Sequence, residues 1–233
     1  KNDPEFAKKL ASLAEIYVND AFGTAHRAHA STEGVTKYLK GYAGFLMEKE
    51  IRYLHGAVQS PKRPFVAVLG GSKISGKIDV ITVLLGKVDR LLVGGAMMFT
   101  FLKAQGKPVG RSLVEDDRLE LARQLLADAA RRNVELVLPT DCLASASPDG
   151  TARASVKRVD QLHDDEMGVD IGPESLALFA AKLKDAKTVV WNGPMGIFEV
   201  PGFAAGTMGV AKAIAELKAG GAVTVVGGGD SVA

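Results

Sequence analysis

Two lysines, Lys73 and Lys77, lie four residues apart just after a pair of glycines, Gly70 and Gly71, which end the apolar run 65–69. A strand that ends in consecutive glycines, with a helix expected next, exposes backbone N–H groups to which a phosphate can bind. Two ammonium groups beside such N–H groups would suit a polyphosphate. A tight turn with two solvated lysines accounts for the same residues equally well, so the local sequence leaves both interpretations open.

The same segment comes close to the P-loop pattern of nucleotide-binding proteins. Gly71, Gly76 and Lys77 have the required spacing, but Ile78 stands where a Ser or Thr should hold the metal. We therefore do not expect a true P-loop. The combination of adjacent glycines with two lysines remains the informative feature.

A second glycine-rich turn ends in an acidic residue. Three glycines at 227–229 follow the apolar run 222–226 and precede Asp230 and Ser231. A carboxylate among phosphate-binding N–H groups is unfavourable unless a cation bridges it, and Mg²⁺ takes few ligands from the protein and the rest from phosphate and water. Asp230 is therefore a candidate single metal ligand. Asp230 or Ser231 could also cap a helix that begins here, and the two roles are compatible.

A third turn, 191–199, follows another apolar run. It offers Asn192 as a neutral hydrogen-bond donor for a phosphate oxygen and Glu199 as an acceptor for ribose hydroxyls. Local turn bonding and a solvated surface are the alternative roles of these two side chains. We expect Trp191 in the core.

A fourth turn, Gly94 and Gly95, precedes the apolar stretch 96–99, which suits either the floor under a flat base or the core. Near the start of the chain, Arg27 lies between two histidines in a loop of small residues. Its guanidinium could bind an anionic substrate in a bidentate manner, whereas we expect the histidines to be solvated. Cys142 is most simply a small buried residue.

Composition narrows the classes of function. With 47% apolar and 24% charged residues, the 233-residue chain can form a well-packed core, and its net charge of +2 is too small to indicate binding to nucleic acid or to an anionic membrane surface. A single cysteine forbids an internal disulfide, which fits a reducing cytosol. The chain does not begin with Met and stops where a helix should start, so we expect an internal piece of a longer protein.

Strand-like apolar runs alternate with helical patterns through most of the chain. The expected strands cover 65–69, 90–93, 134–138, 188–191 and 223–226, and the expected helices cover 75–86, 97–104, 116–132, 173–184 and 203–218. This alternation predicts an α/β fold: a doubly wound, mainly parallel, Rossmann-like sheet with helices on both faces in three layers. Ligands of such sheets bind beyond the carboxyl ends of the strands, where all the glycine turns lie.

The ends of the chain differ from this alternation. Asp3 followed by Pro4 indicates a helix start. Residues 141–170 are less regular, with 153–159 as a possible strand. We expect 1–43 to be the end of one domain, 44–60 a connecting helix, and 61–233 most of a second domain.

Taken in order, six segments resemble phosphoglycerate kinase: 18–29, 70–78, 94–95, 170–174, 191–199 and 227–231. The resemblance implies a hinged two-domain glycolytic enzyme that transfers a phosphoryl group between 1,3-bisphosphoglycerate and ADP, with Mg²⁺ on the nucleotide. It also implies a cytoplasmic monomer with small-molecule substrates and no nucleic-acid or membrane partner. The chain would then contain the end of the acceptor domain (1–43) and a truncated nucleotide-binding domain (61–233).

The resemblance also implies a role for each matching residue. Arg27 would contact the acceptor, Lys73 would neutralise the transferring phosphoryl group, and Lys77 would bind nucleotide phosphates. The remaining nucleotide-binding residues would be Gly71, Gly94, Gly95, Val169, Asn192, Ile197, Glu199, Gly228, Gly229, Asp230 and Ser231, with Asp230 also at the metal. Two alternatives stay open: a fragment that binds MgADP or MgATP without turnover, and a dinucleotide-dependent oxidoreductase, whose G-x-G-x-x-G signature is not found after the first strand of the sheet.

Overall fold

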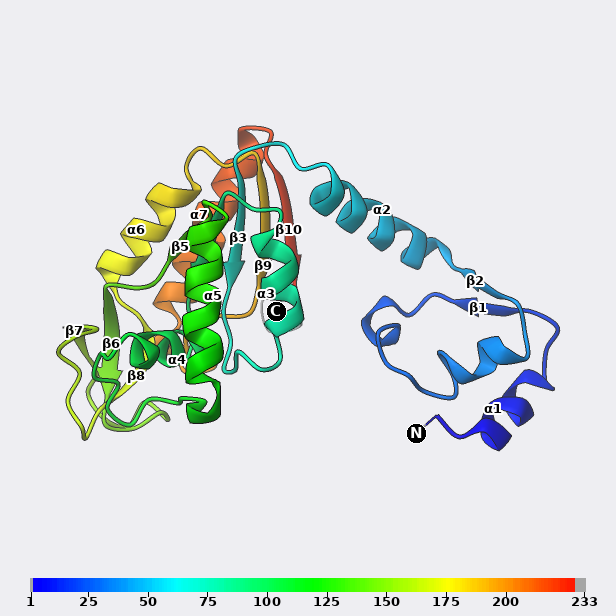
Figure 1. Ribbon diagram of the computed structural model, residues 1–233, viewed down its shortest axis with the longest axis horizontal. Helices are drawn as coiled ribbons and strands as arrows, with labels where there is room; N and C mark the ends of the chain where they lie inside the picture. The colour runs from blue at the N-terminus through cyan, green and yellow to red at the C-terminus, as the bar shows by residue number, and fades with distance from the viewer. Residues whose placement is uncertain (1, 229–233) are drawn as a thin grey trace. The chain divides into compact units, whose positions relative to one another are not determined.

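The computed structural model describes residues 2–228, apart from the side chains of residues 55 and 57 (Figure 1). Contacts between residues divide the chain into two compact units, Lys1–Ser60 and Pro61–Ala233. Among the described residues, no helix combines the length and the apolar composition that crossing a membrane requires.

The first unit is built from short elements. They are α1 (Pro4–Ala11), β1 (Tyr17–Asn19), η1 (Phe22–Thr24), η2 (Gly34–Lys37), β2 (Gly41–Ala43) and α2 (Phe45–Gln59). Asp3 caps α1 as expected, because its carboxylate accepts the N–H of Phe6 at 2.7 Å. The two strands pair in parallel, with Tyr17 opposite Gly41.

The second unit contains a five-stranded sheet in the order β10-β9-β3-β4-β5, in which every pair is parallel. Its strands are β3 (Phe65–Leu69), β4 (Arg90–Val93), β5 (Glu135–Val137), β9 (Thr188–Asn192) and β10 (Val223–Gly227). All five runs predicted as strands form strands, and the predicted fold class is confirmed. All five residues of β3, at the centre of the sheet, are buried.

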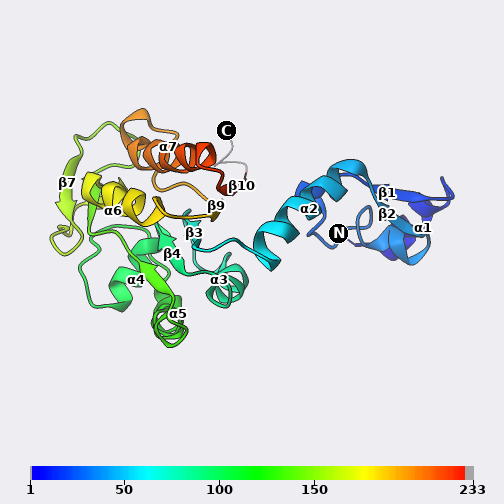
Figure 2. The same cartoon turned by 90° about the horizontal axis from the view of Figure 1, so that it is seen from above.

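Helices cover both faces of this sheet. They are α3 (Ile78–Leu85), α4 (Met97–Ala104), α5 (Leu119–Arg131), α6 (Pro173–Leu183) and α7 (Ala205–Ala219). Figure 2 shows α6 and α7 on one face and α3 and α5 on the other. The side chains of β3 alternate accordingly: Val66 and Val68 pack in the core on the α6–α7 side, and Phe65, Ala67 and Leu69 pack in the core on the α3–α5 side.

A second, antiparallel sheet was only partly predicted. Its order is β7-β6-β8, with β6 (Asp141–Ser145), β7 (Ser155–Arg158) and β8 (Met167–Ile171). The expected strand at 153–159 corresponds to β7. The other two strands were missed because their sequences, DCLAS and MGVDI, mix polar and small residues with the apolar ones. Cys142 is buried in β6 as expected, and burial raises the pKa of its thiol to about 12.

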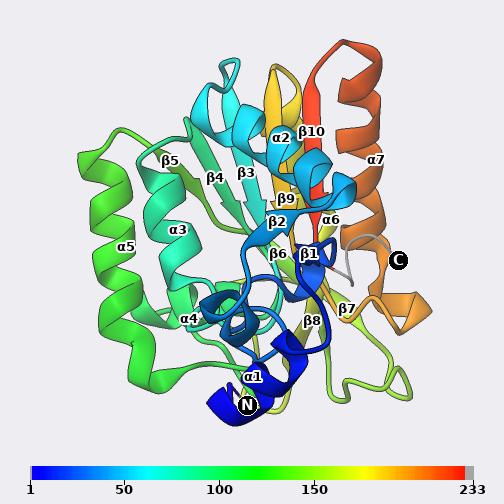
Figure 3. The same cartoon turned by 90° about the vertical axis from the view of Figure 1, so that its right-hand side faces the viewer.

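Because all five strands of the larger sheet run in the same direction, their carboxyl ends share one edge (Figure 3). The turns that begin at Gly70, Gly94, Gly193 and Gly228 therefore leave the sheet together. We call this the carboxyl edge, and we call the opposite edge, where these strands begin, the amino edge.

Candidate functional site

Three glycine turns at the carboxyl edge are hydrogen-bonded to one another. The N–H of Gly70 donates to the carbonyl of Asn192 and that of Gly71 donates to the carbonyl of Pro194, each at 2.9 Å. The N–H of Gly95 donates to the carbonyl of Met195 at 3.1 Å. The loops after β3, β4 and β9 thus form one connected floor.

The glycines allow these loops to approach closely. An added Cβ would clash with the carbonyl oxygen of Pro194 at Gly70, with the backbone of Gly71 at Gly95, and with the carbonyl of Gly70 at Gly193. Gly95 and Gly193 also have positive φ angles of 63° and 95°. Larger residues would separate the loops.

This geometry corrects one expectation. The N–H groups of Gly70, Gly71 and Gly95 are engaged by carbonyl groups of the 192–195 segment, so they are not open donors for a phosphate. Glycine pairs at strand ends are typical of both phosphate cradles and closely packed loops, and the sequence pattern does not distinguish them. These three N–H groups therefore cannot bind an anion unless the contacts between the loops break.

Lys77 supplies one such side chain. It lies just before α3, is half-buried, and its ammonium group donates to the backbone carbonyl of Asn192 at 3.0 Å and to the side-chain oxygen of the same residue. Both acceptors belong to a residue of another loop, so these two bonds fix the direction of the ammonium group. Asn192 was expected to contact a phosphate, and in this structure it orients the lysine.

Lys73 and Lys77 line the same cavity, of about 290 Å³, together with Asn192. Lys73 is exposed. The other residues around this cavity are Gly71, Ser72, Gly76, Gly193, Pro194 and Gly228. Five of the predicted nucleotide-binding residues, Gly71, Lys73, Lys77, Asn192 and Gly228, therefore surround one space with two ammonium groups.

A second cavity, of about 420 Å³, adjoins the first, because Gly71, Ser72 and Pro194 line both. Its walls are largely apolar, and its side chains include Met98, Phe99, Leu113, Met167, Val169 and Ile197. Met98 and Phe99 are also core residues, which confirms the core interpretation of the stretch 96–99, while a role under a flat base stays a prediction. A space that joins an apolar pocket to a cationic one suits a ligand with a flat apolar end and an anionic end.

Of five further predicted residues, four line the apolar cavity. Gly95, Val169, Ile197 and Glu199 line it, and Glu199 provides a carboxylate at its rim. Gly94 does not line it. An added Cβ at Gly94 would lie 2.5 Å from the sulfur of Met195, so Gly94 makes room for a side chain that forms part of the wall.

Asp170 is a buried carboxylate in the same wall that the sequence did not single out as a site residue. Burial raises its pKa to about 6, against the opposing effect of hydrogen bonds from the N–H groups of Gly206 and Ile171. The bond from Gly206 ties β8 to the start of α7, and the hydroxyl of Thr207, which accepts the N–H of Met195 at 2.9 Å, ties the 194–199 loop to the same helix. No local pattern could have revealed a partner that lies 36 residues away.

The other predicted residues fall outside this geometry. Arg27 is exposed in the first unit, where its backbone carbonyl accepts the Thr32 hydroxyl at 2.5 Å. Gly229, Asp230 and Ser231 lie outside the described residues. Within residues 2–228 there is no group of three or more His, Cys, Asp or Glu side chains that could hold a metal ion.

A cavity of about 640 Å³, which is larger than these two, lies elsewhere, beside β7 and the start of α6. Its charged residues include Lys157, which pairs with Glu166 at 2.9 Å, and Asp141, which accepts the N–H groups of Glu174 and Ser175. None of the predicted site residues that the structure describes borders it, and both of these side chains already have partners within the protein.

Comparison with known proteins shows the family of the chain. The family model described as phosphoglycerate kinase matches residues 1–233. The chain is 59% identical over its full length to a chloroplastic phosphoglycerate kinase of Volvox carteri, covering 51% of that protein, and 58% identical to a cytosolic one of Triticum aestivum, covering 58%. A solved phosphoglycerate kinase structure from Coxiella burnetii matches 99% of the chain with a TM-score of 0.87 and 45% identity, and 60% of that structure is covered.

The chain thus spans between half and three-fifths of the length of these relatives. One of them is named chloroplastic and another cytosolic, so the relatives do not fix a cellular compartment. By the match of its whole length and the order of its motifs, the chain belongs to the phosphoglycerate kinase family.

Proposed function

We propose that residues 61–233 bind ADP or ATP at the carboxyl edge, as the nucleotide-binding part of an enzyme that transfers a phosphoryl group between 1,3-bisphosphoglycerate and ADP. The observation that carries the proposal is the pair of joined cavities, one apolar and one lined by Lys73 and Lys77. The base would occupy the apolar cavity, and the phosphates would lie between the lysines. Glu199 would accept hydrogen bonds from the ribose hydroxyls.

The residues of the chain suit a transfer without a covalent intermediate. An acyl phosphate already has a good leaving group, so the protein needs to align the reactants and neutralise the charge of the moving phosphoryl group. Lys77, oriented by Asn192, would hold the phosphate tail of the nucleotide. Lys73, at the exposed end of the same cavity, would face the transferring group. Exclusion of water would protect the acyl phosphate from hydrolysis.

Magnesium would supply further charge neutralisation on the nucleotide phosphates. The described walls of the cationic cavity provide ammonium and amide groups, which fit phosphate rather than a metal. The residue proposed as the metal contact, Asp230, and the proposed phosphate-binding residues Gly229 and Ser231, are outside the described part of the chain.

Residues 1–43 would contribute the end of the acceptor domain, with Arg27 as a contact for the anionic acceptor. Family membership does not support the oxidoreductase alternative. The alternative of binding without turnover remains a matter for experiment, because the relatives are longer than this chain. A monomeric state and a cytoplasmic location stay predictions.

Two measurements test the proposal. Calorimetric titration of the chain with ADP in the presence of Mg²⁺ should show one site, and NAD should not bind. A coupled assay with 1,3-bisphosphoglycerate should show turnover if the chain is sufficient for catalysis. ADP binding without turnover would restrict the function of the chain to nucleotide binding, and a folded chain that binds no ADP would contradict the proposal.

A further inference from the structure

A carboxylate from a distant part of the chain binds the turn between Lys73 and Lys77. Glu115, just before η3 (Asp116–Arg118), accepts the N–H of Ile74 at 2.5 Å and the N–H of Ser75 at 3.1 Å with one oxygen, and the Ser75 hydroxyl with the other. Three donors from two consecutive residues therefore converge on one side chain. These two residues lie at the centre of the segment whose ends are the lysines.

Both sides of this contact are attached to the core. The N–H of Glu115 donates to the hydroxyl of Thr100 in α4 at 3.2 Å, and Thr100 is buried. On the other side, the Ile74 side chain is fully buried and packs in the same core as Ile81 and Phe101. The carboxylate thus connects two well-packed elements, and it cannot move far without breaking these bonds.

The charge of Glu115 is accommodated by hydrogen bonds. Burial alone would raise the pKa of this carboxyl, but the hydrogen bonds from Ser75 and Ile74, followed by the positive charge of Lys73, outweigh burial and lower the pKa below its usual value. The side chain is therefore ionised at neutral pH. Hydrogen bonds to an ionised acceptor are stronger than neutral ones, which favours a fixed turn.

We propose that Glu115 is a positioning residue for the phosphate end of the nucleotide site. By holding the N–H groups of Ile74 and Ser75, it fixes the turn so that Lys73 and Lys77 line the same cavity. The inference rests on the proposed function, because it requires the nucleotide phosphates to bind between these lysines. The N–H groups of Ile74 and Ser75 are already engaged by this internal carboxylate, so in this arrangement the lysines rather than these two N–H groups would meet the phosphates.

The test compares ADP with adenosine, which lacks the phosphates. In calorimetric titrations of the chain, Glu115→Ala should weaken ADP binding by roughly tenfold, the size expected when charge-assisted hydrogen bonds that position a binding group are lost. Adenosine binding should stay the same in the variant and the wild type. Glu115→Gln should weaken ADP binding less, because the amide oxygen can still accept one of the N–H groups.

The sign of the effect separates positioning from simple repulsion. If Glu115 acted only as a negative charge near the phosphates, both variants would bind ADP more tightly than the wild type does, and that result would overturn the proposal. If Glu115→Ala does not fold, Glu115→Gln provides the same test with the same expected direction.

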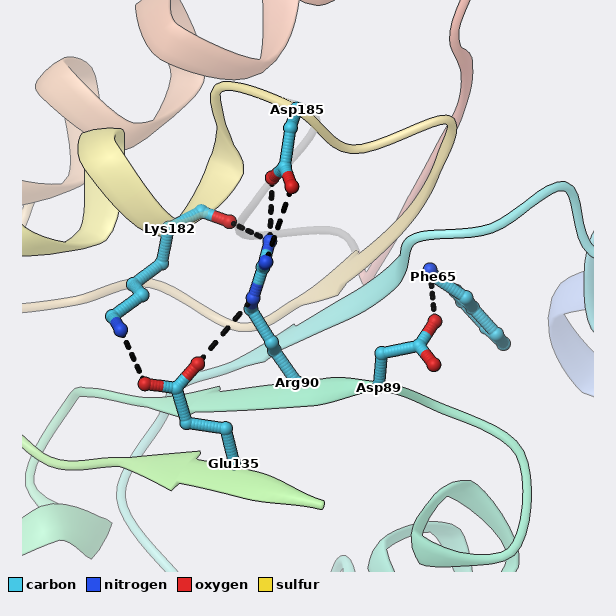
Figure 4. A network of polar contacts seen from close by, with 6 residues as sticks. All are labelled: Phe65, Asp89, Arg90, Glu135, Lys182 and Asp185. Carbon is cyan, nitrogen blue, oxygen red and sulfur yellow. Dashed lines mark hydrogen bonds and ion pairs between the residues drawn. The ribbon is translucent and has the colours of Figure 1, made fainter. Parts of the chain in front are cut away.

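A matched control separates positioning from stability. Asp89 also accepts a backbone N–H, that of Phe65 at 2.7 Å, but at the amino edge (Figure 4). Asp89→Ala should lower the melting temperature and leave ADP affinity unchanged. If Glu115→Ala behaves in the same way, Glu115 has only a structural role and the proposal is wrong. A folded wild-type chain that binds no ADP would instead remove the proposed function, and with it this inference.

Discussion

The two edges of the parallel sheet use charged side chains in opposite ways. At the amino edge, the basic side chains of Arg63, Arg90 and Lys182 pair with carboxylates. At the carboxyl edge, Lys77 donates to the neutral oxygens of Asn192, while the carboxylate of Glu115 is held largely by N–H and hydroxyl groups. Basic side chains are therefore paired with carboxylates at the amino edge, whereas at the carboxyl edge two lysines line one cavity, which is the arrangement that the proposed anion site requires.

At the amino edge, basic and acidic side chains form a network of ion pairs (Figure 4). Arg90 of β4 donates to both carboxylate oxygens of Asp185, at 2.5 and 3.1 Å, and to the carbonyl of Lys182 at 2.9 Å. Glu135 of β5 bridges Arg90 and the ammonium group of Lys182. This network joins the end of α6 to two strands, so its function is structural.

The largest effect is expected from Lys73→Ala in the full-length protein. Turnover should fall by roughly two to three orders of magnitude, the size found when one group that stabilises the transition state is removed, while ADP binding stays mostly intact. Steady-state kinetics and calorimetry measure the two quantities separately. A variant with normal turnover would contradict the role of Lys73 and weaken the contrast between the edges.

The loop contacts at the carboxyl edge can be tested with two glycines of the same turn. Gly70→Ala should destabilise the protein by about 2 kcal/mol and weaken ADP binding, because the new methyl group clashes with the carbonyl of Pro194. Gly76→Ala is the control, since a Cβ there meets nothing within 4 Å. Chemical denaturation measures the free energy of unfolding of both variants. Equal stability of the two variants would mean that the loops separate easily and that the observed floor is not essential.

The sequence predicted the layers of the fold better than the contacts of the site. Continuous apolar runs such as 65–69 identified every strand of the parallel sheet, because strands buried on both faces carry few polar residues. The antiparallel strands β6 and β8 have no such runs and were missed. Helix α3 begins at Ile78, three residues later than expected, and the turn before it is bound by Glu115, a partner that the local sequence could not show.

The sequence predicted which residues would gather at the candidate site, but it did not predict the hydrogen bonds that they form. Glycine turns and lysines after parallel strands correctly indicated one edge of the sheet. The sequence could not show that the amides of Gly70 and Gly71 pair with another loop, or that Asn192 binds a lysine, because each partner lies more than 100 residues away. Contacts of that range depend on the folded topology.

A lysine exchange sharpens the comparison of the edges. Lys77→Met keeps most of the apolar stem but removes the charge, so ADP should bind about tenfold more weakly while adenosine binds as before. Lys182→Met removes a charge of the same kind at the amino edge, where Glu135 already neutralises it, and should leave ADP affinity unchanged. Calorimetry measures the ADP affinity of both variants. If both lose ADP affinity equally, the two edges do not differ in function.

The smallest effect concerns the amino edge itself. Arg90→Met should lower stability by about 1 kcal/mol at neutral pH without changing ADP affinity, because Arg90 is partly exposed and its ion pairs are screened by solvent.

The hydrogen bond from Arg90 holds the pKa of Asp185 below its usual value. Stability gained from an ionised group of lowered pKa is present above the unfolded-state pKa and is lost as the pH falls through the folded-state value. The difference in melting temperature between the variant and the wild type should therefore shrink as the pH falls below about 4, the usual range of an aspartate. Arg131→Met, which removes the pair between a more exposed arginine and Asp128 in the same unit, should show little difference at either pH. A difference for Arg90→Met that persists unchanged in acid would assign its contribution to packing of the side-chain stem rather than to the charge network.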